Sequence, residues 1–161
     1  GMVPLGWKLN HQKKHVSADI FLSHFHHDHI CGLPFFTPFF KAENNFRIWA
    51  GVSPTYRSIK GLLSKVIRGP FCPFTPDAFL ANIDYQEFKA GAVLTPYPGL
   101  KVSTTPLNHP NKATGFRIEY NNKVICYVSD TEHTIGTHDP LVLDLCKNAD
   151  VMIYDSMFVD A

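Results

Sequence analysis

A run of metal-ligating side chains lies near the start of the chain. Four of the nine histidines fall in the six residues from His24 to His29, with the skeleton His24-x-His26-x-Asp28-His29. Imidazole nitrogens and carboxylate oxygens bind zinc and similar ions at about 2.0–2.2 Å. The run can therefore serve one divalent ion or, as two pairs, two adjacent ions. The alternative is a chance cluster or a metal-scavenging tract, which is more typical of a polar tail.

The expected structure around this run favours a metal site that the fold forms over a chance cluster. Residues 18–23 form an apolar stretch that is too short for a helix and predicts a buried strand, and the histidines follow it at once. A loop at the end of a strand can turn side chains that are two positions apart into one cavity. Because the histidine run directly follows a buried strand, it is not expected to be a metal-scavenging tract in a polar tail.

Strands and helices are expected to be interspersed along the chain, as in a mixed α/β fold. The apolar patterns predict further strands at 46–50, 82–88, 100–106, 113–120, 123–128 and 150–154. Asn121-Asn122 is the expected hairpin turn, because asparagine tolerates the positive φ of a type I′ turn. Residues 5–15 are expected to be the end of a helix, and further helices are expected at 30–33, from Ser53-Pro54 to Gly69, and from Asp139-Pro140 to Cys146. The Pro- and Phe-rich segments 34–40 and 70–80 are expected to be loops.

Composition limits the classes of function. The 161 residues suit about one domain, and 45% apolar with 18% charged residues indicate a core-forming chain. A formal charge of +1 gives no field that favours nucleic acid or an anionic membrane. No apolar run approaches the ~20 residues that span a bilayer. The four cysteines contain no C-x-x-C pair, so we expect reduced thiols in a cytoplasmic protein.

More motifs follow the histidine run along the chain. They are Leu107-Asn108-His109-Pro110, Thr114 to Ile118, Tyr127 to His133, and Ile153-Tyr154-Asp155. With the histidine run, this series resembles the metallo-β-lactamase-fold hydrolases, in the branch of the ribonuclease Z-like and cyclic phosphodiesterase-like proteins. The resemblance extends from about Asp19 to Asp155. It implies an α/β fold, the four-layer αββα sandwich in incomplete form, as a single domain over residues 1–161.

The resemblance also implies ligand roles. The implied sets are His24, His26 and His109 for a first metal, Asp28 and His29 for a second, and a bridging Asp130. A hydroxide between two cations about 3.5–4 Å apart would be the nucleophile. Asp28 would also act catalytically, by steering that hydroxide or the leaving-group proton. Nitrogen and oxygen ligands suit zinc, manganese and iron alike.

Two departures from the family pattern bear on activity. The family has a further histidine for the second metal beyond the strand that ends at Asp155, and none follows here before Ala161. Only 23 residues precede His24, where the family has several strands and a Gly-rich loop that bears an aspartate. The chain therefore resembles the middle of a longer enzyme, and a weakly held second metal is expected.

The expected function is hydrolysis of a small phosphodiester at a dinuclear centre. Thioester or ester hydrolysis of the glyoxalase II type is an alternative, and a non-catalytic metal-binding remnant is another. A tRNA-processing nuclease is disfavoured because no basic run supplies an RNA-binding surface. We also expect a homodimer, because a partial sandwich leaves strand edges uncovered and the chain holds 13 Phe, 2 Trp and 6 Tyr residues.

Other polar residues near these motifs have open roles. Glu132, His133 and Asp155 are candidates to orient the ligand imidazoles, and a helix N-cap is the alternative for Asp155. His27 alternates with the ligands and should point away from the metals, toward substrate or solvent.

Two further groups of residues are weighed against simpler roles. His11 and His15 could share a metal at a spacing of four, although such pairs usually lie on a solvated helix face. Cys126 alternates within a strand and is expected in the core. Asp130 stands where class B β-lactamases carry a cysteine, and His26 stands where flavodiiron proteins carry a glutamate. Both differences argue against those two activities.

Overall fold

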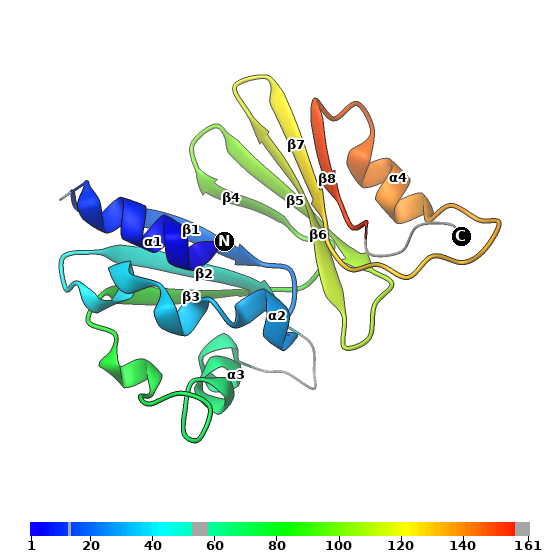
Figure 1. Cartoon of the computed structure of the whole chain (residues 1–161). Helices are drawn as coiled ribbons and strands as arrows, with labels where there is room; N and C mark the ends of the chain where they lie inside the picture. Colours follow the sequence, from blue (N-terminus) through cyan, green and yellow to red (C-terminus); the bar gives the residue numbers. More distant parts are fainter. Residues whose placement is uncertain (13, 53–57, 157–161) are drawn as a thin grey trace. The chain divides into compact units, whose positions relative to one another are not determined.

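The computed structural model describes residues 1–12, 14–52 and 58–156 (Figure 1). The chain divides into two compact units, Gly1–Phe88 and Lys89–Ala161, and the strands of each unit form a sheet of their own. None of the described helices is long and apolar enough to cross a membrane.

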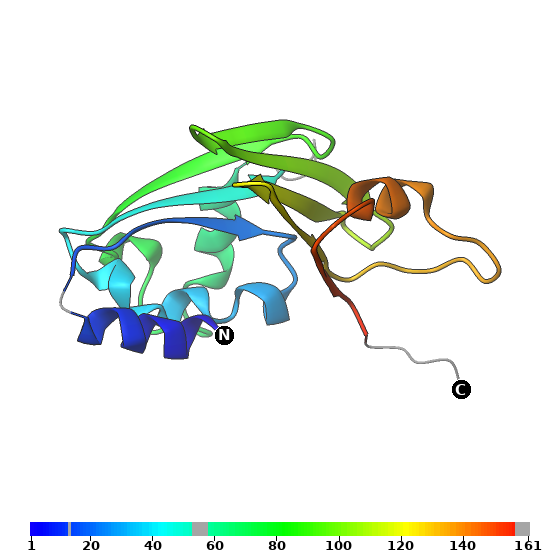
Figure 2. The ribbon, with the colours of Figure 1, turned by 90° about the horizontal axis from the view of Figure 1, so that it is seen from above.

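The first unit is a parallel sheet with helices on one face. Its described strands form a three-stranded sheet in the order β1 (Ser17–Leu22), β2 (Asn45–Gly51), β3 (Asn82–Phe88). Its helices are α1 (Met2–His11), α2 (His27–Ile30) and α3 (Ile59–Val66), with 3₁₀ turns η1 (Leu33–Phe35), η2 (Thr37–Phe40) and η3 (Pro76–Ala78). Figure 2 shows these helices along one face of the sheet.

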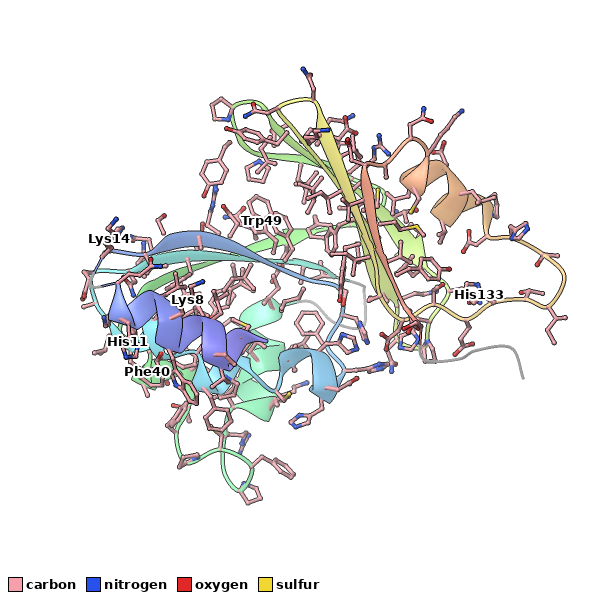
Figure 3. The ribbon with its side chains drawn as sticks, turned by 45° about the horizontal axis from the view of Figure 1, so that its top comes forward. Lys8, His11, Lys14, Phe40, Trp49 and His133 are labelled. Atoms are coloured by element: carbon pink, nitrogen blue, oxygen red, sulfur yellow. The ribbon has the colours of Figure 1, made fainter. Side chains whose placement is uncertain are left out.

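Alternation along β2 explains which face the helices cover. Phe46 and Ile48 are at most 2% exposed and belong to one apolar cluster with Ile59 of α3. Trp49 points to the other face, away from α1 (Figure 3). There its indole nitrogen donates to the Asp19 carboxylate at 2.6 Å. The helical side is therefore apolar, and the opposite side carries polar contacts.

The second unit is a mixed sheet backed by one short helix. Over residues 89–156 the strands are ordered β4 (Val93–Tyr97), β5 (Leu100–Leu107), β6 (Ala113–Tyr120), β7 (Lys123–Val128), β8 (Val151–Tyr154). Neighbours from β4 to β7 are antiparallel, whereas β8 runs parallel to β7. The connection from β7 to β8 contains α4 (Pro140–Cys146), whose Val142 and Leu145 pack in a cluster with Leu107 and Val128.

Several local predictions are confirmed. Strands lie within a residue or two of the predicted ranges at 18–23, 46–50, 82–88, 100–106, 113–120, 123–128 and 150–154. Asn121 and Asn122 have φ values of 48° and 59°, as the two-residue turn requires. Asp139 caps α4, because its carboxylate accepts from the Leu141 amide at 2.8 Å.

The helix predictions are less accurate. The first helix spans Met2–His11, so residues 5–11 are the end of a helix as expected, but the helix stops at His11 and does not reach His15. The short helix expected at 30–33 ends at Ile30 instead, because the chain already turns within the histidine run. Helix α3 begins after Ser58, whose hydroxyl accepts from the Gly61 amide at 3.1 Å. The predicted start at Ser53-Pro54 lies outside the described residues.

Proline accounts for the remaining differences. The segments 34–40 and 70–80 contain the turns η1, η2 and η3, each with a proline in its first positions. Proline suits the first turn of a helix because it has no amide hydrogen to donate there. Strand β4 was not predicted because Pro96 interrupts its pattern. In the sheet that the described residues form, β4 is an edge strand, where proline is tolerated.

Candidate metal centre

The end of β1 places two imidazoles against each other. Ser23 and His24 follow the strand and are 9% and 4% exposed. The Nε2 atom of His24 lies 2.9 Å from Nδ1 of His26. Two ring nitrogens at this distance either share one proton or, when both are deprotonated, can share one cation. This pair of donors therefore fits a divalent ion.

Helix α2 adds the other two donors of the run. Because α2 starts at His27, Asp28 and His29 lie in a single turn directly after the first pair. His29 Nε2 is 3.2 Å from an Asp28 carboxylate oxygen, and its ring centroid is 4.2 Å from that of His24. The Asp28 side chain is 76% exposed. The four predicted ligands of the first unit thus lie together, whereas His27 is exposed, as expected from its alternation.

In the second unit, strand direction brings two predicted ligands together. Strands β5 and β7 both pair antiparallel with β6, so they run in the same direction and end at the same edge of the sheet. His109 follows β5 and Asp130 follows β7. His109 Nε2 is 3.6 Å from an Asp130 carboxylate oxygen, with the side chains 15% and 31% exposed. An imidazole nitrogen and a carboxylate oxygen are again donors that suit a divalent ion.

Two hydrogen bonds tie the loops of this pair together. The Glu132 amide donates to the Asn108 carbonyl at 2.6 Å, and the Asn108 side-chain amide donates to the Glu132 carbonyl at 2.9 Å. Asn108 precedes His109, and Glu132 follows Asp130 by two positions. The two bonds, here called the Asn108–Glu132 clamp, therefore hold the spacing of the ligands. Asn108 was missed as a functional residue, although its place beside His109 in the motif was a usable signal.

Two other candidates of this unit, His133 and Asp155, make contacts at the ends of β8 and β7. His133, labelled in Figure 3, stacks on Tyr154 and lies 3.1 Å from its hydroxyl. The Asp155 amide donates to the Val128 carbonyl at 3.0 Å, which extends the pairing of β8 with β7. Burial, and then the charges of Asp130 and Asp155, raise the pKa of Tyr127. His133 thus contacts the last residue of β8, and Asp155 is held to the end of β7.

The remaining sequence candidates have ordinary structural partners. His11 Nδ1 lies 2.6 Å from the Trp7 carbonyl, and His15 Nδ1 lies 2.5 Å from the Glu43 carbonyl. The two imidazoles thus contact separate carbonyls, as on a solvated surface. Cys126 is fully buried, as predicted, and burial is the main cause that raises the pKa of its thiol to about 11.

Solved structures of other proteins share this fold. The metallo-β-lactamase fold protein YhfI from Bacillus subtilis is 17% identical at a TM-score of 0.56, over 83% of this chain and 47% of that one. The Zn²⁺-bound PqqB from Methylobacterium extorquens is 18% identical at a TM-score of 0.54, and the match covers 86% of this chain and 45% of PqqB. The short form of human tRNase Z is 16% identical at a TM-score of 0.57, and the match covers 83% of this chain and 56% of the tRNase Z chain.

The sequence itself identifies the family. The model of the beta-lactamase superfamily domain matches residues 7–161, so the chain belongs to this superfamily. No curated protein matches it. The chain spans about half the length of the three similar structures, which at these identities share the fold alone. The predicted resemblance and the partial metallo-β-lactamase fold are confirmed, and the His/Asp donors could bind a divalent metal.

Proposed function

We propose that this chain carries the metal centre of a hydrolase that cleaves a small phosphodiester. The observation that carries the proposal is the buried residue His24, whose Nε2 atom faces His26 Nδ1 at 2.9 Å. The arrangement offers two imidazole nitrogens to one point, within a superfamily of metallo-hydrolases. A polar tail or a solvated helix face does not account for this pair, because His24 is only 4% exposed.

The proposed ligands come from both units. They are His24, His26 and His109 for a first ion, Asp28 and His29 for a second, and Asp130 for both. Two divalent ions, zinc or manganese or else iron, would lower the pKa of a water molecule and stabilise charge on a phosphoryl group. The exposed Asp28 carboxylate, which lies 3.2 Å from His29, would steer the hydroxide or the leaving-group proton.

Two considerations support a phosphodiester of small size. The human tRNase Z, which is similar in fold, is by its name a nuclease of tRNA, and nucleases cleave phosphodiester bonds. The formal charge of +1 on this chain supplies no extended basic surface for a nucleic acid. We therefore favour a small substrate over tRNA and over a thioester.

The test is hydrolysis of bis(p-nitrophenyl) phosphate by the purified chain, with metal content measured in parallel. After dialysis we expect one ion per chain and weak activity, because the second set of donors includes the exposed Asp28. Added Mn²⁺ or Zn²⁺ should restore activity, and Asp28→Ala should abolish the restored part. Full activity with one bound ion would contradict the use of two metals.

A non-catalytic, one-ion protein is the second candidate. It is favoured by the contrast in exposure, since His24 is 4% exposed while the Asp28 side chain is 76% exposed. An ion at Asp28 and His29 would then exchange freely with solvent. Absence of hydrolysis at every metal concentration, with the parent chain and Asp28→Ala behaving alike, would select this candidate.

We also propose that two copies of the chain associate through β8. Val151, Met152 and Ile153 are 50–53% exposed and lie on the edge strand of the second sheet, as the described residues have it. An apolar edge strand with unpaired backbone groups favours pairing with another strand. Light scattering at micromolar concentration should give a dimer, and Met152→Lys should shift it to the monomer. A monodisperse parent monomer would count against this pairing.

A further inference from the structure

Ser23 contacts the outer nitrogen of the most buried imidazole in the histidine run. Its hydroxyl oxygen lies 3.1 Å from His24 Nδ1, and the side chain is 9% exposed. The inner nitrogen, Nε2, is the one that faces His26. Ser23 therefore occupies the side of the His24 ring that is turned away from the proposed ion.

The chemistry of imidazole gives this contact a consequence. A neutral imidazole carries one proton, and a nitrogen can bind a metal only when it does not hold that proton. If Nε2 binds the ion, the proton must sit on Nδ1, and a buried N–H without an acceptor is costly. The Ser23 hydroxyl is an acceptor at hydrogen-bond distance from that nitrogen.

We infer that Ser23 is a positioning residue for the metal site. It accepts a hydrogen bond from the Nδ1–H group of His24, which leaves Nε2 free of a proton and fixes the plane of the ring. The inference rests on the proposed function only in requiring that a metal binds. It does not depend on which substrate is hydrolysed or on whether hydrolysis occurs.

The place of Ser23 in the fold supports the assignment. It directly follows Leu22, which is paired with Ala50 in the parallel ladder of β1 and β2. The sheet holds the main chain at this point, so it places Ser23 beside His24 independently of any ion. Partners of this kind around ligand imidazoles typically change metal affinity by about 10- to 100-fold when they are removed.

The experiment measures zinc affinity of the 161-residue chain by competition with a chromophoric chelator. Ser23→Ala should weaken zinc binding by about 10- to 100-fold. Ser23→Thr keeps the hydroxyl and should restore affinity to near that of the parent. Ser17→Ala, in the exposed first residue of the same strand, is the matched control and should leave affinity unchanged. Circular dichroism of each variant checks that the fold is retained.

A spectroscopic readout separates positioning from a loss of packing. In the zinc-bound parent, ¹⁵N-labelled His24 should show an Nδ1-bound proton that exchanges slowly with water. Ser23→Ala should speed that exchange, and Ser23→Thr should slow it again. Unchanged exchange and affinity in Ser23→Ala would overturn the inference while leaving the metal site intact. Zinc binding without hydrolysis would instead defeat the proposed function and leave the role of Ser23 standing.

Discussion

The two units bring their predicted ligands together in different ways. In the first, four donors lie in one short segment after β1, and side chains hold one another, as His24 does with His26 and Ser23. In the second, His109 and Asp130 are far apart in the sequence and meet because β5 and β7 end at one edge. There the contact between loops runs through the main chain of Glu132. One arrangement is local and depends on spacing, and the other depends on topology.

The largest expected effect tests whether the two arrangements serve one ion. His24→Ala and His109→Ala should each lose the tightly bound metal. The fall in metal affinity should exceed the ~100-fold that results from loss of a residue that only hydrogen-bonds a ligand. His11→Ala is the control, because the His11 ring lies against the Trp7 carbonyl on α1. Metal content after gel filtration gives the result. Retention of the ion in His109→Ala alone would show that the histidine run binds without the second unit.

The next effect sharpens the comparison, because it removes one of the two hydrogen bonds of the Asn108–Glu132 clamp without changing a ligand. Asn108→Asp keeps the shape of the side chain but, when ionised, cannot donate to the Glu132 carbonyl. The spacing of His109 and Asp130 should loosen, and metal affinity should fall by about tenfold. His138→Ala, an exposed residue further along the same loop, should have no effect. Equal metal affinity in Asn108→Asp and the parent would show that this hydrogen bond of the clamp does not hold the ligands in place.

What could be predicted from the sequence follows the same division. The histidine run and its strand could be identified from spacing, because period-two patterns and neighbouring donors are local properties. Pairing of His109 with Asp130 depends on strand direction, and only the family resemblance supplied it. Ser23 and Asn108 were missed because a serine or asparagine beside a ligand is common, and its partner is set by geometry. The start of α2 within the histidine run could not be predicted from helix propensities either, because no side chain caps this helix.

Helix caps offer a smaller, matched test of stability in each unit. Ser58 caps α3 through one bond to Gly61, and Asp139 caps α4 through the Leu141 and Val142 amides at 2.8 and 3.4 Å. Ser58→Ala and Asp139→Ala should each lower the free energy of unfolding by about 1 kcal/mol. Urea titrations give the values. A cost for Ser58→Ala well above that for Asp139→Ala would mean that the single hydroxyl does more than cap α3.

The smallest expected effect concerns acid and the second unit alone. The Lys123 ammonium, and then the Val124 amide, hold the pKa of the Asp150 carboxyl below its usual range. Because the pKa is lower in the folded chain, the stabilisation is complete above the unfolded value of about 3.9 and is lost as pH falls through the folded value. Asp150→Asn should therefore be less stable than the parent at pH 7, and the difference should shrink below about pH 4. Thermal unfolding at about pH 7, 5, 4 and 3 measures it, with Asp144→Asn on α4 as the control. A difference that stayed constant over this range would show that the loss in Asp150→Asn does not come from the charge that attracts Lys123, because the parent carboxyl itself loses that charge as the pH falls.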